Sequence, residues 1–323
     1  MAHYLITGAA GFIGARTSTM LIEQGNTVVG IDNINDAYDP RMKHYRLKKL
    51  QALKGFSFHQ HDISEKSAID LFKNEKFDGV INLAARAGVR YSVDNPWVFV
   101  ESNVVGTLNM LEVCRQFGCK KFILASTSSI YGENPEYPTP ETASSSEPMQ
   151  PYAASKKGAE ALVHSYHHLY DIDATIVRYF TVYGPAGRPD LAIFRFVKWI
   201  IEGEPIRING DGKQSRGFTY VDDIARGTIA ALKPLGYEVI NLGGHEVISI
   251  NDLVSLIEDL TGKKANIQYG PPNLADMFMN QANVTKAREI LGWNPQVTLR
   301  EGIKNLIDWY YAEREWAKEI LMP

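Results

Sequence analysis

The sequence predicts an α/β protein built on a parallel β-sheet, and three observations support this fold class. Short apolar segments alternate with longer segments of helical periodicity through the first 180 residues. A glycine-rich turn directly follows the first apolar segment. The connections between the apolar segments are long enough to hold helices, as parallel strands require. Because such crossovers are right-handed, we expect a doubly wound, Rossmann-type sheet with helices on both faces.

Six strands and five helices are expected in the first part of the chain. The strands are short apolar runs bounded by turn residues, and the helices carry apolar residues at three- and four-residue spacing. We expect strands at 4–7, 27–32, 56–61, 79–83, 121–126 and 173–179. We expect helices at 12–23, 41–54, 64–74, 95–117 and 151–170.

The pattern changes after Tyr179. Residues 183–189 include two glycines and two prolines, which predict a loop. The later elements are shorter and more mixed: helices at 192–202, 222–231, 249–260 and 299–320, and a strand at 206–208. We therefore expect a Rossmann domain over residues 1–180 and a smaller mixed α/β domain over residues 181–323. Some segments of the second domain are expected to return to the first.

Composition excludes several classes of protein. The chain has 323 residues, of which 45% are hydrophobic and 22% charged, as in globular proteins with a core. A net charge of −3 argues against a nucleic-acid-binding protein, and no apolar run approaches the ~20 residues of a membrane span. Cys114 and Cys119 form no disulfide framework, and His164 with His168 lacks a third metal ligand. We expect a cytoplasmic protein without a metal, a signal peptide or a membrane segment.

A glycine-rich turn of the dinucleotide-binding type follows the first expected strand. Thr7-Gly8-Ala9-Ala10-Gly11-Phe12-Ile13-Gly14 stands between that strand and an expected helix. Its glycines allow the backbone to approach a pyrophosphate, whose charge the free N–H groups of the helix start can hold. Asp32 ends the second strand, where a carboxylate accepts hydrogen bonds from the adenosine ribose and repels a 2′-phosphate. This pattern predicts NAD rather than NADP as the cofactor.

A tyrosine and a lysine suited to acid–base chemistry begin the helix expected at 151–170. Tyr152 and Lys156 are four residues apart, so their side chains share one helix face. A phenol with a pKa of about 10 is a poor base at pH 7, but a neighbouring ammonium group favours the phenolate. The fifth strand ends in hydroxyl residues 126–129, at the sheet edge where open α/β folds bind their ligands.

With these motifs the chain resembles the extended short-chain dehydrogenases/reductases, and among them the nucleotide-sugar epimerases, over essentially its whole length. The stretches that carry the resemblance are 7–14, 82–85, 126–132, 152–156 and 178–183. The resemblance implies that Tyr152 is the acid/base, that Lys156 lowers its pKa and binds the nicotinamide ribose, and that Thr127 binds the reacting hydroxyl. The cofactor-binding residues that we expect are Gly8, Gly11, Phe12, Ile13, Gly14, Asp32, Asn33, Asp62, Ile63, Leu83, Ala84, Ala85, Asn103, Tyr152, Lys156 and Tyr179.

The two residues after Thr127 discriminate between reactions of this family. Dehydratases of the family have an acid pair there, and UDP-glucuronate decarboxylases typically have Glu at the second position. Here the positions are Ser128 and Ser129, so elimination and decarboxylation lack their usual groups. The catalytic groups that are present suit a different reaction: transient oxidation at carbon 4 of the sugar, rotation of the keto-sugar and return of hydride to its other face.

The segment 178–192 resembles the UDP-glucuronate 4-epimerases. UDP-galactose epimerases usually have Asn at the position of Thr181 and lack an arginine like Arg188. Arg188 can give a glucuronate carboxylate a charge-assisted hydrogen bond, and hydroxyls can complete the site. The expected binding residues for a UDP-sugar are Arg90, Ser128, Ser129, Thr181, Arg188, Arg216 and Asp276, with Arg216 at the diphosphate.

Three other functions remain open at this point. Two are in the same family: 4-epimerisation of UDP-glucose or UDP-N-acetylglucosamine, and oxidative decarboxylation of UDP-glucuronate. The third is a non-catalytic NAD-binding regulator, which commonly lacks the Tyr or the Lys that are both present here. The resemblance also implies a homodimer that pairs the helices expected at 95–117 and 151–170 with their symmetry mates.

Overall fold

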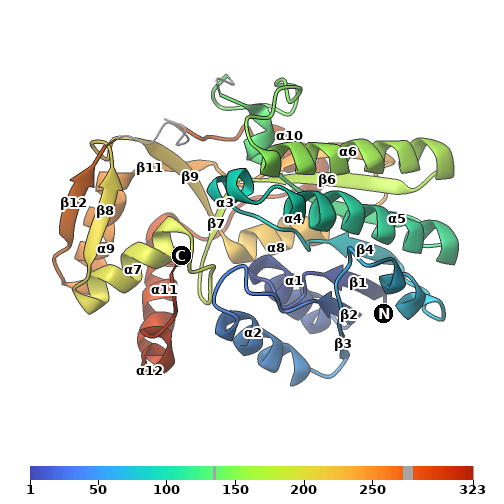
Figure 1. Cartoon of the computed structure of the whole chain (residues 1–323), viewed down its shortest axis with the longest axis horizontal. Helices are drawn as coiled ribbons and strands as arrows, with labels where there is room; N and C mark the ends of the chain where they lie inside the picture. The colour runs from blue at the N-terminus through green and yellow to red at the C-terminus, as the bar shows by residue number, and fades with distance from the viewer. Residues whose placement is uncertain (134–135, 272–278, 323) are drawn as a thin grey trace.

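A seven-stranded parallel sheet lies at the centre of the computed structural model, which describes residues 1–133, 136–271 and 279–322 (Figure 1). Its strand order is β10-β6-β5-β4-β1-β2-β3. The order reverses at β1, which pairs with β2 on one side and with β4 on the other. The strands are β1 (His3–Thr7), β2 (Thr27–Asp32), β3 (Phe56–Gln60), β4 (Gly79–Asn82), β5 (Lys121–Thr127), β6 (Asp173–Tyr179) and β10 (Tyr237–Leu242). The predicted fold class is confirmed.

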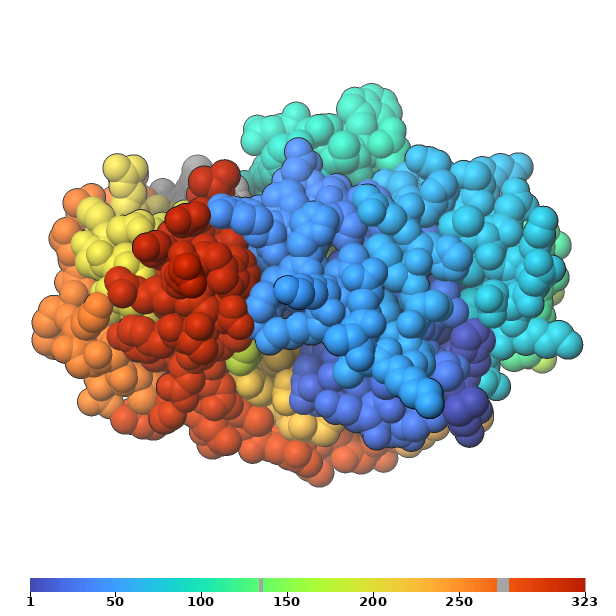
Figure 2. All heavy atoms as spheres, turned by 90° about the horizontal axis from the view of Figure 1, so that it is seen from below, coloured from blue at the N-terminus to red at the C-terminus, as the bar shows by residue number. Residues whose placement is uncertain are grey.

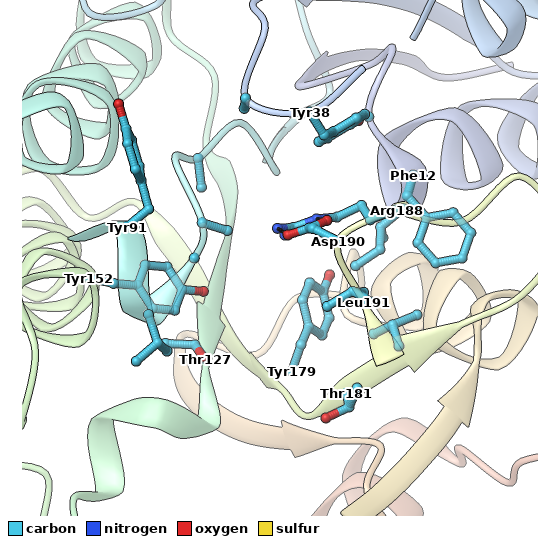
Figure 3. A pocket seen from close by; sticks show the side chains of 18 of the residues that line it. Phe12, Tyr38, Tyr91, Thr127, Tyr152, Tyr179, Thr181, Arg188, Asp190 and Leu191 are labelled. Atoms are coloured by element: carbon cyan, nitrogen blue, oxygen red, sulfur yellow. Dashed lines mark hydrogen bonds and ion pairs between the residues drawn. The ribbon is translucent and has the colours of Figure 1, made fainter. Parts of the chain in front are cut away.

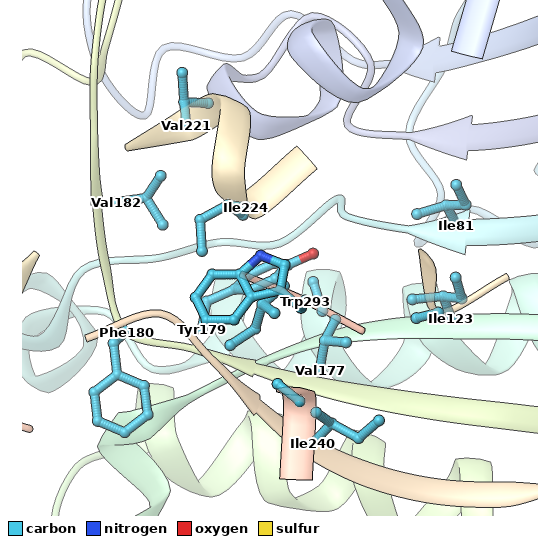
Figure 4. Packing of buried hydrophobic residues seen from close by; sticks show 14 of the residues in the cluster. Ile81, Ile123, Val177, Tyr179, Phe180, Val182, Val221, Ile224, Ile240 and Trp293 are labelled. Atoms are coloured by element: carbon cyan, nitrogen blue, oxygen red, sulfur yellow. The ribbon is translucent and has the colours of Figure 1, made fainter. Parts of the chain in front are cut away.

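Alternate residues of each strand face opposite layers of helices. Ile6 belongs to the core on the side of α1 and α8, whereas Leu5 belongs to the core on the side of α5 and α6. Because helices cover both faces, the strands are apolar on both faces. Figure 4 shows the first of these cores, in which Trp293 packs beside Ile224 and Val177. The covering helices are α1 (Phe12–Glu23), α5 (Gly106–Phe117), α6 (Pro151–Tyr170), α8 (Val221–Ala230) and α10 (Thr285–Leu291).

The first half of the chain departs from the sequence-based expectations in three details. Residues 64–74 form two 3₁₀ turns, Lys66–Ala68 and Asp70–Phe72, instead of one α-helix. The helix expected at 95–117 is divided into α4 (Trp97–Phe99), a π-helical turn and α5. The π-helical turn, Val100–Val105, widens the helix where Asn103 is buried. A further short helix, α3 (Val89–Asp94), was not predicted.

The second half builds a smaller lobe with its own core. A three-stranded sheet and a two-stranded sheet pack there with four helices around residues such as Ile200, Leu253 and Ile303. The strands are β7 (Thr181–Tyr183), β8 (Pro205–Asn209), β9 (Ser215–Tyr220), β11 (Glu246–Ser249) and β12 (Asn266–Gly270). The helices are α7 (Ala192–Glu202), α9 (Ile250–Thr261), α11 (Leu299–Ala312) and α12 (Arg314–Ala317), so the helix expected at 299–320 ends early.

Parts of the second half lie in the main sheet and its core. Strand β10, which the sequence analysis did not predict, pairs with β6 as the seventh parallel strand. Helix α8 and Trp293 belong to the core beneath that sheet. The division into two domains, with some later segments returning to the first, stays a prediction, as does the boundary near residue 180.

Helix α2 (Arg41–Gln51) connects the main sheet to the C-terminal segment. The Tyr45 hydroxyl donates to the Glu313 carboxylate at 2.8 Å and accepts from the Trp309 indole N–H at 2.9 Å. The backbone N–H of Leu321 donates to Asp39 at 2.9 Å. Figure 2 shows these early and late parts of the chain in contact on one face of the molecule.

No helix among the described residues is both long and apolar enough to cross a bilayer. No group of three or more His, Cys, Asp or Glu side chains in the same part of the chain is arranged to hold a metal ion.

Candidate active site

A cavity of about 1160 Å³ lies at the carboxyl edge of the main sheet and extends toward the smaller lobe. Open parallel sheets bind their ligands at this edge. Most of the predicted site residues share this one cavity. It is lined by Gly8, Gly11, Phe12, Ile13, Gly14, Asp32, Asn33, Asp62, Ile63, Leu83, Ala84, Ala85, Arg90, Thr127, Ser128, Ser129, Tyr152, Lys156, Tyr179, Thr181, Arg188 and Arg216.

The glycine-rich turn is shaped for close backbone approach. Gly8 has φ of +65°, and a Cβ there would lie 2.8 Å from the backbone nitrogen of Ala84. A Cβ on Gly14 would collide with the carbonyl oxygen of Gly8. Helix α1 starts after Gly11 with no side chain capping its first N–H groups. These N–H groups are therefore available to an anion such as a pyrophosphate.

The acidic residue at the end of β2 has a basic partner that the sequence analysis missed. Asp32 Oδ1 accepts from Lys43 Nζ at 3.2 Å and from the backbone N–H of Ile34 at 2.9 Å. Both Asp32 and Lys43 are buried. Beside them, Asn33 Nδ2 donates to Asp62 at 2.6 Å, so two predicted adenosine-side residues are joined. Lys43 lies within a helix rich in basic residues, and nothing in its local pattern separates it from its neighbours.

Asn103 is placed behind the cavity and is absent from its lining. Its side-chain nitrogen donates to the backbone oxygen of Arg86 at 3.0 Å and to Ser155 Oγ at 2.9 Å. Its side-chain oxygen accepts from the backbone N–H of Arg86 at 2.8 Å. Asn103 therefore holds the backbone after Ala85 against helix α6. Direct contact of Asn103 with a cofactor stays a prediction.

The three predicted catalytic residues converge on one wall of the cavity. Thr127 ends β5 and pairs in register with Tyr179 of β6, while Tyr152 and Lys156 are on the first turns of α6. Figure 3 shows Thr127 and Tyr152 side by side, with both hydroxyls directed into the cavity. Burial raises the pKa of Tyr152, whereas its hydrogen bond with Thr127 and the positive charge of Arg188 act to lower it.

Lys156 is buried next to the buried carboxylate of Glu160. Its side chain is 2% exposed. Burial lowers the pKa of Lys156 to about 8, against the attraction of Glu160, which raises it. This value leaves most of the Lys156 side chains cationic at pH 7, as the stabilisation of a nearby phenolate requires. Glu160 follows Lys156 by one helical turn and was not predicted as a site residue.

The opposite wall carries the loop between β7 and α7. Arg188 and Asp190 extend from this loop toward Tyr152, with the ring of Tyr38 above them (Figure 3). Arg188 Nε donates to Asp190 Oδ1 at 3.0 Å, and the guanidinium carbon lies 5.9 Å from the centre of the Tyr38 ring. Burial acts to lower the pKa of Arg188, but the Asp190 carboxylate raises it above its usual value.

The serines after Thr127 present hydroxyls to the cavity. Thr127 Oγ1 donates to Ser129 Oγ and accepts from the backbone N–H of Ser129, both at 3.2 Å. Ser128 Oγ accepts from Asn280 Nδ2 at 3.2 Å, which ties this turn to the segment after residue 278. Asp276 lies outside the described residues.

Arginines from three elements of the smaller lobe line the cavity. Arg195 is on α7, Arg207 on β8 and Arg216 on β9. Only Arg216 was predicted. Within the described residues, Nε of Arg195 is buried without a hydrogen-bond partner, and its guanidinium carbon lies 4.7 Å from the centre of the Trp199 ring. Single arginines on amphipathic elements resemble surface residues, so sequence patterning gives no signal for them.

The fold and the cavity define a class of protein: enzymes that oxidise or isomerise a sugar nucleotide with a dinucleotide cofactor. Such enzymes combine a glycine turn of this kind with a Tyr–Lys pair and a cavity wall that carries arginines. The chain matches the model of the GDP-mannose 4,6 dehydratase family over residues 5–306. It belongs to that family. Together with the epimerases that the chain matches, described next, this match confirms the predicted membership of the nucleotide-sugar epimerases among the short-chain dehydrogenases/reductases.

Individual relatives narrow the comparison. The chain is 53% identical over 323 residues to a UDP-glucuronate 4-epimerase of Thermodesulfobacterium geofontis, with 99% of each chain covered. It matches the crystal structure of the Bacillus cereus UDP-glucuronic acid 4-epimerase in complex with UDP-glucuronic acid and NAD with a TM-score of 0.90. That match has 37% identity and covers 96% of this chain and 99% of that one. The UDP-glucose 4-epimerase of Thermotoga maritima with UDP-glucose matches with a TM-score of 0.87 and 32% identity, covering 97% and 99%.

Proposed function

We propose that this protein is an NAD-dependent isomerase that converts UDP-glucuronate to UDP-galacturonate by inverting carbon 4 of the sugar. One observation carries the proposal. The cavity places the Thr127–Tyr152–Lys156 group opposite Arg188, with serines in both positions after Thr127. The relatives named UDP-glucuronate 4-epimerase, which cover nearly the whole chain, support the same activity.

The cavity suits NAD at its glycine-turn end. The backbone of the glycine turn is packed too closely for a Cβ at Gly8 or Gly14, and the start of α1 that follows the turn has no side-chain cap. The turn would hold the pyrophosphate, Asp32 the adenosine ribose and Lys156 the nicotinamide ribose. Bound NAD supplies the group that accepts the hydride from carbon 4 and returns it.

Tyr152 is the proposed acid/base. Its phenolate takes the proton from the carbon-4 hydroxyl, and the phenol so formed returns a proton to the same oxygen when the product forms. Thr127 binds that oxygen and orients it toward Tyr152. The Lys156 ammonium stabilises the phenolate electrostatically, because both groups are buried where charges are poorly screened.

The intermediate of this reaction must keep its carboxylate. A 4-keto-glucuronate is a β-keto acid, which loses carbon dioxide when its carboxylate turns perpendicular to the carbonyl group or is desolvated. Ser128 and Ser129 supply hydroxyls in place of the carboxylic acids found in related dehydratases and decarboxylases. These hydroxyls solvate the carboxylate without providing an acid that would promote its loss.

Arg188 is the proposed cation for the sugar carboxylate, with Thr181 and the two serines as hydroxyl donors. Arg188 contacts Asp190 in the structure, so substrate binding exchanges one carboxylate partner for another. Arg90 lines the same part of the cavity and is proposed to contact the sugar. A neutral sugar would leave the Arg188–Asp190 pair unchanged and gain no charge-assisted hydrogen bond.

The nucleotide is proposed to lie toward the smaller lobe. Arg195, Arg207 and Arg216 line that end of the cavity, and the planar guanidinium group suits phosphate oxygens. The Nε of Arg195, buried without a partner among the described residues, is a donor to which a diphosphate oxygen can bind. Asp276 keeps its proposed role at the uridine. In this arrangement the later half of the chain is the UDP-sugar-binding domain.

The protein is further proposed to be a cytoplasmic homodimer. Both cysteines are free and buried, as a reducing compartment favours. Exposed apolar side chains lie on α3, α4 and the π-helical turn, and further ones lie at the end of α6; exposed apolar surface marks interaction sites. They are Tyr91, Val93, Trp97, Val100, Leu169 and Tyr170.

A panel of three substrates tests the proposed function. The protein with NAD is incubated separately with UDP-glucuronate, UDP-glucose and UDP-N-acetylglucosamine, and the products are resolved by NMR. Conversion of UDP-glucuronate alone to its 4-epimer is expected. Epimerisation of either neutral sugar in preference to UDP-glucuronate would replace this proposal with a different epimerase. A UDP-pentose as the main product would replace it with a decarboxylase.

A further inference from the structure

Arg46 connects three loops that meet at the cavity. It is on α2, and its side chain is 4% exposed. Arg46 Nε donates to the carbonyl oxygen of Ala186 at 2.9 Å, and Nη2 donates to that of Gly187 at 3.1 Å. Nη1 donates to the carbonyl oxygen of Ala10 at 3.2 Å and to the Tyr38 hydroxyl at 2.8 Å. One guanidinium group thus joins the glycine-rich turn, the loop after β2 and the loop before α7.

The loop before α7 needs such support. Ala186 has φ of +52°, in the left-handed region that residues with a Cβ rarely adopt. Its carbonyl and that of Gly187 both accept from Arg46, and Arg188 follows directly in the chain. A strained backbone persists only where its surroundings determine it, and here the Arg46 guanidinium is part of those surroundings.

Arg46 also acts on Arg188 indirectly, through contacts that both arginines make with Tyr38. The Tyr38 hydroxyl accepts from Arg46, and the guanidinium carbon of Arg46 lies 5.5 Å from the centre of the Tyr38 ring. The guanidinium carbon of Arg188 lies 5.9 Å from the same ring centre. Cations are attracted to the faces of aromatic rings. Arg46 therefore acts on both the backbone before Arg188 and the ring that Arg188 approaches.

We propose that Arg46 is a positioning residue that sets the sugar specificity of the site by fixing the loop that carries Arg188. Arg46 is not in the lining of the cavity, so it acts through other residues. The inference rests on the proposed function, in which Arg188 binds the sugar carboxylate. Without Arg46 the loop leaves its strained conformation, and Arg188 loses its fixed approach to carbon 6 of the sugar.

The test compares binding of UDP-glucuronate and UDP-glucose to the NAD-loaded protein by calorimetry. Arg46→Met is expected to reduce the preference for UDP-glucuronate by about 10-fold or more, as loss of a charged partner does. Arg188→Ala is expected to reduce the preference similarly. The double variant is expected to show no further reduction beyond about 2-fold, because residues that act through one another are not additive. Arg46→Lys retains the positive charge but not the planar, multiply donating guanidinium group, so it is expected to recover part of the preference for UDP-glucuronate.

Arg16→Met is the matched control. Arg16 also makes a bidentate contact between two elements, with Nε and Nη2 donating to Asp222 at 2.7 and 2.8 Å, but it does not contact the loop before α7. The control should leave the preference unchanged. Three results would each overturn the proposal. Arg46→Met could weaken the binding of both ligands equally, or the double variant could lose the product of the two single reductions in preference. Arg16→Met could also lose as much of the preference as Arg46→Met.

A second variant protects the test against misfolding. If Arg46→Met does not fold, Tyr38→Phe removes only the hydroxyl that Arg46 contacts and must lower the same preference, or the proposal fails. Failure of the proposed function is visible separately, before any variant is made. It would appear as a wild-type protein that binds both sugars equally or leaves UDP-glucuronate unconverted.

Discussion

Lys156 and Glu160 lie one turn apart on the buried face of α6, and Glu160 joins that helix to the two strands beneath it. The Glu160 carboxylate accepts from Ser126 Oγ of β5 at 2.7 Å and from Arg178 Nη2 of β6 at 2.8 Å. Burial acts to raise the pKa of Glu160, but these hydrogen bonds lower it below its usual value. A negative charge therefore stays next to Lys156 at neutral pH.

The first prediction is a shift in the pH dependence of kcat/KM in Glu160→Gln. Activity requires the Lys156 ammonium, so the wild-type profile is expected to fall above about pH 8. Glu160 raises the pKa of Lys156, so removing its charge lowers that pKa further. The basic limb must then move to lower pH, because Lys156 loses its proton earlier as the pH rises.

The matched control for this prediction is Glu112→Gln. Glu112 is on α5, accepts from Arg115 at 2.6 Å and does not line the cavity. Its variant should keep the wild-type profile. A basic limb that stays in place in Glu160→Gln, or one that moves equally in Glu112→Gln, would show that Glu160 does not act on Lys156.

Tyr152→Phe tests the acid/base assignment. The variant loses the phenol that moves the proton, so turnover should fall by about 100-fold or more. Bound NAD and the folded state should be retained, because the ring still fills its place against Phe99. Tyr170→Phe, a half-exposed tyrosine at the far end of the same helix, is the control. Near-normal turnover in Tyr152→Phe, measured by NMR of the sugar product, would assign the proton transfer to another group.

Asp32→Ala should narrow the difference in affinity between NAD and NADP. The wild-type protein is expected to prefer NAD, because the carboxylate binds the ribose hydroxyls and repels a 2′-phosphate. In the variant Lys43 loses its carboxylate partner at 3.2 Å and becomes available to that phosphate. Calorimetry with both cofactors should show the ratio changing by about 10-fold or more. Equal affinities in the wild type, or an unchanged ratio in the variant, would remove Asp32 from this role.

Light scattering should give twice the chain mass of 36.1 kDa at micromolar concentration. Trp97, which is 75% exposed, lies in the apolar patch proposed as the dimer interface. A buried, unpaired carboxylate is costly, so Trp97→Glu should shift the protein toward the monomer. Tyr269→Glu, on β12 away from the patch, should leave the mass unchanged. A monomeric wild type would rule out the dimer.

Much of the fold could be predicted from local sequence signals. Pro151 at the start of α6 and glycines after α5, α7 and α9 mark helix ends that the structure reproduces closely. The failures have non-local causes. The π-helical turn is coupled to the contacts of Asn103 with Arg86 and Ser155, and β10 gains its place only by pairing with β6.

The candidate site was predictable where a motif marks it. The glycine turn, Thr127 and the Tyr152–Lys156 pair are recognisable from residue types and spacing within this sequence, and all of them line the cavity. Lys43, Arg46 and Arg195 could not be found in this way. Each is a basic residue on an amphipathic helix, and only tertiary contacts distinguish it from a solvated neighbour.

UDP-glucuronate carrying deuterium at carbon 4 tests the central claim most directly. The wild-type protein with NAD should release UDP-galacturonate that retains the deuterium at carbon 4, because the hydride passes to NAD and back without exchanging with water. NMR and mass spectrometry should show no accumulation of reduced cofactor and no loss of carbon dioxide. A product whose label has exchanged with water, a UDP-pentose, or an unchanged substrate would contradict epimerisation by oxidation and hydride return at carbon 4.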